Sequence, residues 1–527
     1  MWQMPETITD CLAKNVADFR DREALVAVSY RSGEYERKTW REVDEASDRV
    51  AAGLAEIGVR KGQKVAGMLA NYLESVYSFL AIQKIGAVFV PINIRLSARE
   101  VEYIVDNADA DHFIATSNVL PLLEQARSRL EVRNYVCLHR TGQDSPDWCL
   151  SFNQLLESQG KPPVVEVGPD DTAAIIYTSG TTGLPKGVVL TQANEVACGR
   201  MWGSSLGCKR TRYGVGRRQD SYAFYTSSGC AAHIMIWLYF GNVHIMEESF
   251  DVVKTLEMMQ KERSTYYGGA PSMFAFMLNH PRFKEFDTSS LKELSSGGAA
   301  MPGELLRKIQ TAWPGIKIWT TYGLTESSSC GTVLDAADAV TKLGSIGFPL
   351  VPDQEVRVVD PDGRDVKPRE VGEIVLRGPD VMKEYYKNPK ATAEAFKDGW
   401  LHTGDTCYYD EEGYLYFMDR LKDMIVRGGF NVYSVEVENV LYEHPAVKMC
   451  AVIAKPHPKL GEDVLAFVVC KDGVTATAEE LRDFTKDKLA DFKQPRDIRF
   501  LDALPLNPHG KVDKKVLRAE HLSPAAK

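Results

Sequence analysis

Apolar strands alternate with helices in the first part of the chain, and this alternation constrains the fold more than any other feature. KVAGMLA (64–70) and GAVFVPIN (86–93) have the pattern of buried strands, with a helix between them that ends near Lys84. Ser97 and Glu100 then form a capping box, which opens a second helix before another apolar strand. Such units pack as βαβ motifs around a largely parallel sheet. The sequence therefore predicts an α/β fold.

The chain has 527 residues, which is more than one hydrophobic core usually supports. Residues 161–171, KPPVVEVGPDD, form a proline-containing connector between two βαβ blocks. Beyond about residue 419 the pattern changes to short strands (GGFNVYSVEVEN, AVKMCAVIA, DVLAFVV) and a helix that Thr477 and Glu480 cap and that runs to Phe492. We expect a large N-terminal domain of βαβ-type subdomains over 1–419 and a small, mobile α+β domain over 420–527.

Composition excludes several classes of protein. The apolar fraction (44%) and the charged fraction (26%) are those of a globular protein, and the net charge of −9 argues against general nucleic-acid binding. The ten cysteines form no CxxC pair and no zinc-type cluster, so we interpret them as reduced thiols of a cytoplasmic protein. Neither end has the pattern of a targeting or lipidation signal, and the most apolar run, 231–246, is too short to span a membrane.

The segment 177–191, YTSGTTGLPKGVVLT, has the composition of a phosphate-binding loop. Its glycines let backbone N–H groups turn towards an anion, its hydroxyls add donors, and its lysine adds a positive charge. These residues are Ser179, Gly180, Thr181, Thr182, Gly183 and Lys186. A plain polar turn between strands would not account for this density of hydroxyls.

The loop does not match a Walker A motif. That motif needs a glycine directly before the lysine and a hydroxyl directly after it. Here Pro185 precedes Lys186 and Gly187 follows it, so the P-loop interpretation fails in both chemistry and spacing.

TSGTTGLPKGV (178–188) closely resembles the signature loop of the adenylate-forming superfamily, which includes acyl-CoA synthetases, peptide-synthetase adenylation domains and luciferases. Five further motifs of that family follow in order and extend the resemblance over nearly the whole chain. They are SSGGAAM (295–301), TYGLTE (321–326), GWLHTGD (399–405), DRLKDMI (419–425) and LPLNPHGKVDKK (504–515).

The resemblance implies a two-step reaction that uses ATP, Mg²⁺ and coenzyme A. A carboxylate attacks the α-phosphate of ATP to give an acyl adenylate and pyrophosphate, and a thiol then displaces AMP. The leading interpretation is a carboxylic acid–CoA ligase for a fatty or aromatic acid. The alternatives are an acyl-AMP ligase that loads a carrier protein, a luciferase-like oxygenase and a non-catalytic nucleotide-binding homologue.

The resemblance also assigns a nucleotide site. Tyr322 offers a flat face for adenine, Asp405 accepts from the ribose hydroxyls, and Arg420 binds ribose or phosphate oxygens. Gly428 and Gly429 would line the channel for the thiol. The nucleotide- and CoA-binding set is Ser179, Gly180, Thr181, Thr182, Gly183, Gly297, Gly298, Ala299, Thr321, Tyr322, Gly323, Thr325, Asp405, Phe417, Arg420, Lys422, Gly428 and Gly429.

The same resemblance gives Lys511, Lys186, Glu326 and Thr178 the catalytic roles. Lys511 would bridge the substrate carboxylate and the phosphate. Glu326 and Thr178 would supply oxygen ligands to Mg²⁺, a hard cation that keeps several waters. Lys422 would mark the hinge between the two domains, because Lys511 must leave before a thiol can enter.

The acyl pocket departs from the family pattern. Tyr225 or Thr226 takes the place of a histidine found in many relatives, and Gln192 takes the place of another. The candidate walls are mostly apolar or small and suit a hydrophobic acid. They are Tyr225, Thr226, Trp237, Tyr266, Gly268, Ala270, Leu324 and Cys330, with Gly297, Ala299 and Gly323 beside them. Because the region FYTSSG contains no aspartate, activation of an amino acid is disfavoured.

The segment 208–220, CKRTRYGVGRRQD, places five basic residues in an acidic protein. It has three interpretations: a solvated loop, a contact to the phosphates of CoA, or a basic lid that makes a peripheral membrane or acyl-chain contact. The second predicts that neutralising Arg217 and Arg218 raises the KM for CoA. We expect no nucleic-acid partner, and the sequence leaves the oligomeric state open, a dimer included.

Overall fold

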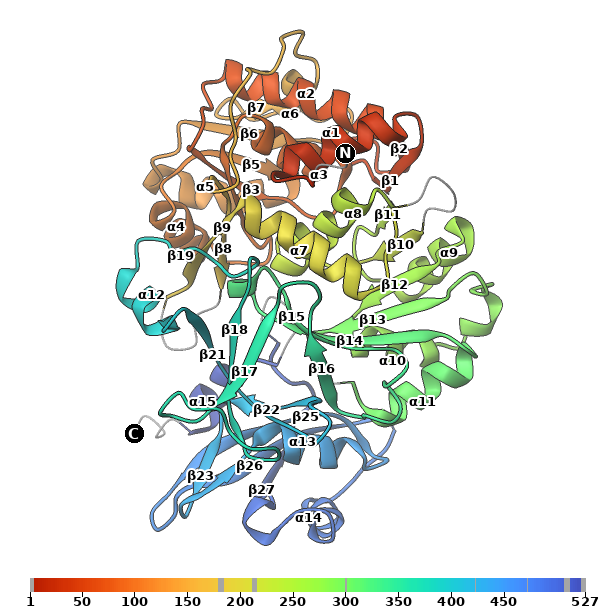
Figure 1. The fold of residues 1–527 in the computed structure, drawn as a ribbon, viewed down its shortest axis with the longest axis vertical. Helices are drawn as coiled ribbons and strands as arrows, with labels where there is room; N and C mark the ends of the chain where they lie inside the picture. Colours follow the sequence, from red (N-terminus) through yellow and green to blue (C-terminus); the bar gives the residue numbers. More distant parts are fainter. Residues whose placement is uncertain are drawn as a thin grey trace. The chain divides into compact units, whose positions relative to one another are not determined.

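The computed structural model describes residues 4–178, 184–210, 216–298, 301–421, 423–471, 473–506 and 512–522. The chain divides into two units, both drawn in Figure 1. The first consists of Met1–Val356 and Leu376–Leu401, and the second of Arg357–Val375 and His402–Lys527.

One sheet of the first unit has eight strands in the order β19-β9-β8-β4-β3-β5-β6-β7. Neighbours from β8 to β7 run parallel, whereas β9 is antiparallel to both β8 and β19. The bounds are β3 Lys64–Met68, β4 Val88–Pro91, β5 Ala110–Thr116, β6 Asn134–Leu138, β7 Leu150–Ser151, β8 Thr172–Thr178, β9 Lys186–Thr191 and β19 Glu384–Tyr385.

A second sheet of this unit follows the order β16-β15-β14-β13-β12-β10-β11-β1-β2. Its strands from β14 to β1 are parallel, and antiparallel pairs flank them at both ends. The bounds are β1 Glu23–Val28, β2 Tyr35–Thr39, β10 Arg217–Asp220, β11 Val243–Met246, β12 Tyr266–Gly269, β13 Glu293–Gly297, β14 Lys317–Gly323, β15 Gly331–Leu334 and β16 Ser345–Pro349.

Helices between these two sheets form the main core of the first unit. Figure 1 shows α7 and α8 between β8 and β9 on one side and β10 to β12 on the other. The buried rings of Trp40 and Trp237 stack within this core with centroids 4.8 Å apart. The core helices are α1 Ile8–Phe19, α2 Trp40–Glu56, α3 Leu73–Lys84, α7 Gln192–Ser205 and α8 Ile234–Phe240.

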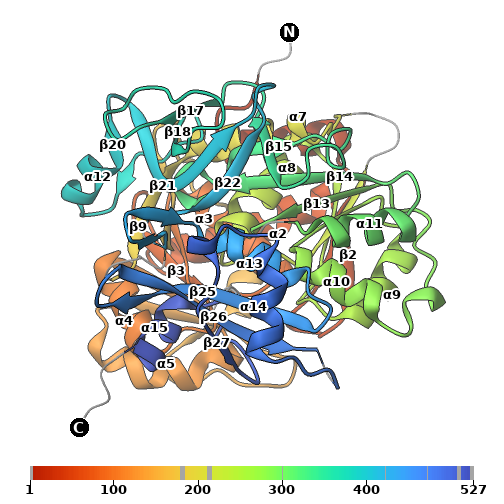
Figure 2. The same cartoon turned by 90° about the horizontal axis from the view of Figure 1, so that it is seen from below.

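Of the remaining helices of the first unit, α6 contributes Phe152 and Leu155 to the same core. The outer helices of the second sheet, α9 to α11, gather on one side of β13 and β14 (Figure 2). The bounds are α4 Ala98–Asn107, α5 Leu120–Ala126, α6 Phe152–Leu156, α9 Val252–Glu262, α10 Pro271–Asn279, α11 Gly303–Ala312 and α12 Pro389–Ala395.

The second unit contains the antiparallel pair β21–β22 and a separate sheet in which β24, β23, β26 and β25 are neighbours and β27 pairs with β26. Buried side chains of β25, β26, α13 and α14 form its core. The bounds are β17 Glu355–Val359, β18 Gly372–Arg377, β21 Trp400–Tyr409, β22 Leu415–Arg420, β23 Ile425–Arg427, β24 Phe430–Val432, β25 Val447–His457, β26 Gly461–Cys470, β27 Asp497–Phe500, α13 Ser434–Tyr442, α14 Ala478–Lys486 and α15 Lys514–Leu522. The short strand β20 Phe396–Lys397 belongs to the first unit.

The α/β class and the organisation into a large and a smaller part are confirmed. The predicted units β3–α3–β4 and α4–β5 are present, and Ser97 with Glu100 forms the capping box of α4. The apolar run 231–246 is buried core rather than a membrane segment. Among the described residues, no helix is both long enough and apolar enough to cross a membrane.

Two secondary-structure expectations in the second unit were wrong. The segment SVEVEN, expected as a strand, forms the start of helix α13. Its alternation imitates a strand, but Val437 and Leu441, one turn apart, face the core. Helix α14, which Thr477 and Glu480 cap as expected, ends at Lys486 rather than at Phe492.

The expectation that all ten cysteines are reduced is also corrected. Cys137 on β6 and Cys149 just before β7 form a disulfide. Eight other cysteines carry free thiols, most of them buried. Twelve residues separate the bonded pair, a spacing that gave no signal in the sequence.

Helix α7 packs closely against α8 because Gly199 has no side chain. A methyl group at this position would lie 2.4 Å from the carbonyl oxygen of Met235. We expect Gly199→Ala to lower the free energy of unfolding by about 1–3 kcal/mol through overpacking, measured as a lower thermal unfolding midpoint. Gly303→Ala in α11 is the matched control, since its nearest contact would be an ordinary 3.4 Å to Leu343. Equal midpoints for the two variants would contradict this prediction.

Candidate functional site

Lys186 begins β9 directly opposite Thr178 at the end of β8. The two strands therefore hold the two ends of the glycine- and hydroxyl-rich loop. Residues Ser179, Gly180, Thr181, Thr182 and Gly183 themselves lie outside the described residues. The Lys186 ammonium group lies 4.7 Å from the centre of the Tyr385 ring, a cation–π distance.

Glu326 lies in a short 3₁₀ turn, Thr325–Ser327, that follows β14. Its Oε1 accepts a hydrogen bond of 2.8 Å from the Tyr385 hydroxyl. Burial, and then the adjacent Glu326 carboxylate, raise the pKa of Tyr385 far above its ordinary value. Tyr385 therefore remains a neutral hydrogen-bond donor at any ordinary assay pH. Its side chain contacts both Lys186 and Glu326, two residues that the sequence analysis assigned to the site.

Backbone hydrogen bonds fix Tyr385 in this position. Met382 N–H donates to the Glu326 carbonyl (2.8 Å), and Lys383 N–H donates to the Val189 carbonyl (3.0 Å). Tyr386 N–H donates to the Gly187 carbonyl (2.7 Å). This segment joins β9 to the turn that carries Glu326. Sequence reasoning missed Tyr385, since it lies outside all the recognised motifs.

A chain of hydroxyl groups joins the segment FYTSSG (224–229) to the TYGLTE motif. Ser227 Oγ lies 3.1 Å from Thr325 Oγ1, and Ser329 Oγ donates to Ser227 Oγ at 2.8 Å. Thr226 caps the π-helical turn Ser227–His233 by accepting from the N–H of Gly229. Ser227 and Ser329 are two more residues that sequence reasoning did not assign.

The glycines expected beside adenine are required by close packing. A methyl group on Gly297 would lie 2.3 Å from Thr321 Oγ1, and one on Gly323 would lie 2.0 Å from the Ser329 carbonyl oxygen. Tyr322 lies between Thr321 and Gly323 at the end of β14. Ala299 lies outside the described residues, and Gly298 has a φ of +80°, which favours glycine.

In the second unit, β21 and β22 place Asp405 opposite Arg420. Arg420 Nε lies 3.5 Å from Asp405 Oδ1, and the aspartate side chain is mostly buried while the arginine is half exposed. Phe417 lies on the same hairpin, opposite Cys407. The expected ribose-binding pair is therefore brought together within this unit.

Gly428 and Gly429 form the turn between β23 and β24, both with positive φ. A side chain on Gly429 would meet no described atom within 4 Å, so the backbone is open there. Lys422 and Lys511 lie outside the described residues. Lys514, three positions after Lys511, is engaged with Ser434 and Glu438.

The residues expected to form the walls of the acyl pocket lie on several different elements of the first unit. Gly268 and Tyr266 lie on β12, Ala270 caps α10, and Leu324 leads into the turn of Glu326. Tyr225 and Cys330 are buried. Trp237 instead packs on Trp40 and donates its indole N–H to the Ala24 carbonyl (2.8 Å), which places it in the core.

The basic segment is not the solvated loop that its composition suggested, as far as it is described. Arg210 pairs with Asp18 and Arg217 pairs with Glu262. Arg218 is buried on β10, with its guanidinium 3.3 Å from the centre of the Tyr266 ring. Residues 211–215 lie outside the described residues. Since both Arg217 and Arg218 have structural roles, neutralising them is not a clean test of CoA binding.

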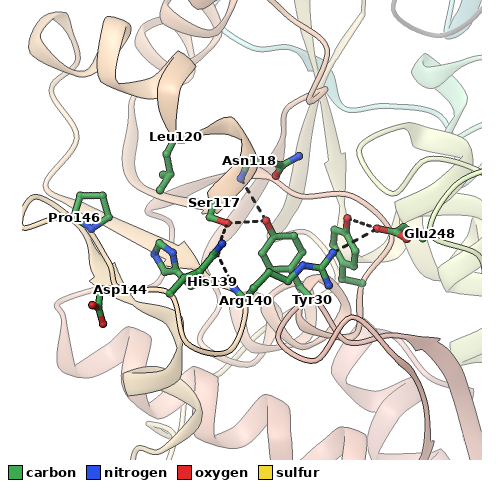
Figure 3. A pocket seen from close by; sticks show the side chains of 11 residues that line it. Tyr30, Ser117, Asn118, Leu120, His139, Arg140, Asp144, Pro146 and Glu248 are labelled. Carbon is green, nitrogen blue, oxygen red and sulfur yellow. Dashed lines mark hydrogen bonds and ion pairs between the residues drawn. The ribbon is translucent and has the colours of Figure 1, made fainter.

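One cluster within the described residues has metal-ligand chemistry: Cys137, His139 and Cys149, all buried. The two sulfurs are joined in a disulfide, whereas a metal binds the thiolate. A cavity of about 780 Å³ lies beside it, lined by polar groups such as Tyr30, Arg140 and Glu248 (Figure 3). Most of these polar groups form hydrogen bonds or ion pairs with one another, and none of them belongs to the motifs described above.

Comparison with known proteins decides the family. The model described as "AMP-binding enzyme" matches residues 12–386, and the one described as "AMP-binding enzyme C-terminal domain" matches residues 436–511. The chain belongs to the AMP-binding enzyme family. It is therefore an adenylate-forming protein of the acyl-CoA synthetase type, as the motifs predicted.

Relatives span almost the whole chain. A feruloyl-CoA synthase of Amycolatopsis sp is 35% identical, over 91% of this chain and 93% of the relative. The long-chain-fatty-acid–CoA ligase FadD13 of Mycobacterium tuberculosis is also 35% identical, over 92% of this chain and 93% of the relative. The crystal structure of the anthranilate CoA ligase AuaEII with anthranoyl-AMP has a TM-score of 0.89 at 28% identity, covering 98% of both chains.

The contact between Tyr385 and Glu326 gives a prediction. Tyr385→Phe removes the hydroxyl that orients the carboxylate but keeps the ring beneath Lys186, so we expect the adenylation rate to fall about 10-fold, at the lower end for lost polar stabilisation. We also expect the Mg²⁺ concentration that gives the half-maximal rate to rise, because Glu326 becomes a less ordered ligand. Pyrophosphate release at varied Mg²⁺ measures both. Tyr386→Phe, which removes a hydroxyl bonded to Asp109 instead, is the control and should leave both unchanged.

Proposed function

We propose that this protein is an ATP-dependent acid–thiol ligase that converts a carboxylic acid to its acyl adenylate and then to an acyl-CoA. The arrangement of Lys186, Tyr385 and Glu326 at the ends of the signature loop carries the proposal. This arrangement places a cation and an oriented carboxylate beside the strands that hold the two ends of the predicted phosphate-binding loop. The relatives with acid–CoA ligase names support the same chemistry.

The first step joins the acid to AMP. A carboxylate oxygen of the acid attacks the α-phosphorus of ATP, and the bond to the bridging oxygen of pyrophosphate breaks. Lys186 neutralises charge on the phosphates, while Lys511 bridges the carboxylate and the α-phosphate. Both stabilise charge that grows in the transition state.

Glu326 and Thr178 form an oxygen-only donor set, which fits Mg²⁺. When bound, Mg²⁺ neutralises phosphate charge. Tyr385 orients the Glu326 carboxylate through its hydrogen bond, and the Ser329–Ser227–Thr325 hydroxyls stabilise the turn that carries Glu326.

The second step uses the other unit. The thiol of CoA attacks the acyl carbon and the bond to the AMP oxygen breaks, so AMP leaves with one oxygen from the acid. We propose Asp405 and Arg420 as ribose ligands, and Gly428 and Gly429 as the walls of the thiol channel. The backbone is open at Gly429, whereas a methyl group on Gly428 would lie 3.2 Å from Leu460 Cδ2. We also propose that the domain boundary lies at 419/420, with the hinge at Lys422.

We propose a fatty or aromatic acid as the substrate class and CoA as the acceptor. The relatives' names include both kinds of acid, and each of those named above is a CoA enzyme. We propose a cytoplasmic location, which the eight free thiols favour and the Cys137–Cys149 disulfide does not. We do not extend the proposal to a membrane contact through 208–220, because Arg210, Arg217 and Arg218 already have protein partners.

Acid-dependent pyrophosphate release with Mg·ATP, with and without CoA, tests this function over fatty acids and aromatic acids. We expect turnover that needs CoA and yields AMP. Release that CoA does not accelerate would instead identify a carrier protein as the acceptor, and no release with any acid would leave a nucleotide-binding homologue.

Lys511→Ala separates the two half-reactions. We expect adenylation to slow by about 10²–10³-fold, by analogy with the loss of one transition-state donor. Conversion of supplied acyl-AMP to acyl-CoA should continue near the wild-type rate, because that step does not use Lys511. Equal losses in both half-reactions would contradict this role. Lys515→Ala, which changes an exposed lysine of the same motif, is the matched control.

A further inference from the structure

The disulfide and the histidine beside it lie at the edge of the eight-stranded sheet, apart from the adenylation motifs. Cys137 belongs to β6, His139 follows directly after the end of that strand, and Cys149 directly precedes β7. The strands β6 and β7 pair in parallel, so the connection 139–149 returns along β6 and brings Cys149 back beside it. All three side chains are buried.

The three side chains are close enough to share one ion. One ring nitrogen of His139 and the two sulfurs lie within 4.8 Å of one another. Zinc binds a thiolate sulfur at about 2.3 Å and an imidazole nitrogen at about 2.0–2.1 Å, so two such ligands of one tetrahedral ion lie about 3.5–3.8 Å apart. Small side-chain rotations therefore bring the three donors onto one ion, once the sulfurs are no longer bonded to each other.

The imidazole of His139 has an unused polar atom. Its Nε2 is buried, and it has no hydrogen-bond partner in the part of the chain that the structure describes. Ser145 Oγ, in the same connection between β6 and β7, is also buried without a described partner. Buried polar atoms in proteins are normally bonded, and an unpartnered one calls for an explanation such as an ion.

The cavity of about 780 Å³ gives an ion a path to this histidine. His139 lines the cavity together with Asp144 and Pro146, and these three lie on the side away from Glu248 (Figure 3). Three protein ligands leave the fourth position of a tetrahedral ion open. Water from the cavity supplies a ligand for that position.

Reduction converts the cross-link into a set of metal ligands. A dithiol attacks one sulfur of the Cys137–Cys149 disulfide, and its second thiol then resolves the mixed disulfide. The dithiol is oxidised to its own disulfide, and the two cysteines gain two electrons and two protons. A zinc ion binds the two sulfurs as thiolates and releases both thiol protons. Cytoplasmic reductants keep cysteines in the reduced form, so a cytoplasmic protein would present this ligand set.

We propose that Cys137, His139 and Cys149 form a zinc site in the reduced protein, and that the disulfide closes this site on oxidation. Two thiolates and an imidazole are ligands that zinc prefers. The ion fastens the connection 139–149 to β6, as the disulfide does in the oxidised protein. Neither state therefore leaves this edge of the sheet without a cross-link. The site is separate from the proposed function, because none of its ligands belongs to the adenylation motifs.

Metal binding to the full chain tests the site without ATP or an acid, so its outcome is independent of the proposed function. The protein is freed of metal, reduced with a dithiol, separated from the dithiol without air and titrated with Zn²⁺. We expect one ion per reduced chain, a higher thermal unfolding midpoint with Zn²⁺, and a thiolate-to-metal charge-transfer band when Co²⁺ replaces it. The oxidised protein should show none of these effects. Equal binding by both forms, or no binding by the reduced form, would overturn the proposal.

Variants identify the ligands. His139→Gln keeps both cysteines, so we expect oxidation to form the disulfide as before while the Kd for Zn²⁺ of the reduced protein rises by at least about 10²-fold, since loss of an outer partner of a metal ligand already costs 10–100-fold. Cys149→Ser should weaken binding similarly, and it gives the test if His139→Gln does not fold. Cys470→Ser, which removes a free and partly exposed thiol of the second unit, is the control and should bind as the wild type does. Wild-type affinity in His139→Gln would refute this site.

Discussion

The short strand β19 and the residues on either side of it are the constraint on which the site depends. Its backbone pairs with β9, which begins at Lys186, and Met382 at its approach bonds to the carbonyl of Glu326. Two motifs about 140 positions apart are thus held by one segment that belongs to neither. Tyr385 then adds the side-chain connection, because its ring contacts Lys186 and its hydroxyl contacts Glu326.

Buried charge has a second organising role. Asp220, Arg218 and Glu262 are nearly inaccessible, and such groups are costly unless they are paired or hydrogen-bonded. Glu262 is paired with Arg37 and Arg217, and Asp220 is bonded to two histidines. These interactions stabilise the charged side chains that β10 and α9 bury.

The sequence predicted the fold class and the residues with local signals. Capping boxes at Ser97 and Thr477 and the parallel strands depend on short patterns, and the structure contains them as expected. Asp405 and Arg420 lie opposite each other on one hairpin, and their role as ribose ligands stays a prediction. Tyr385 was missed because its position depends on strand pairing with β9, which no local pattern encodes. Arg218 looked like part of a basic loop because composition does not show that 217–220 forms a strand in the interior of the sheet, where Arg218, Gln219 and Asp220 are all buried.

The residues expected in the acyl pocket also show that sequence order alone does not determine which way a side chain points. Trp237 was assigned to it by order along the chain, yet α8 turns this side chain towards Trp40. The hydrogen bond between Asp220 and His233 was likewise not expected, because thirteen positions separate the two residues and only the fold brings them together.

The most direct test of the central claim uses an acid labelled with ¹⁸O in its carboxylate, incubated with Mg·ATP and CoA. Attack on the α-phosphorus followed by thiol transfer leaves one labelled oxygen in AMP, which mass spectrometry detects. The account predicts one ¹⁸O atom in the AMP phosphate and none in pyrophosphate. Formation of ADP with ¹⁸O in inorganic phosphate would show an acyl-phosphate route and would contradict it.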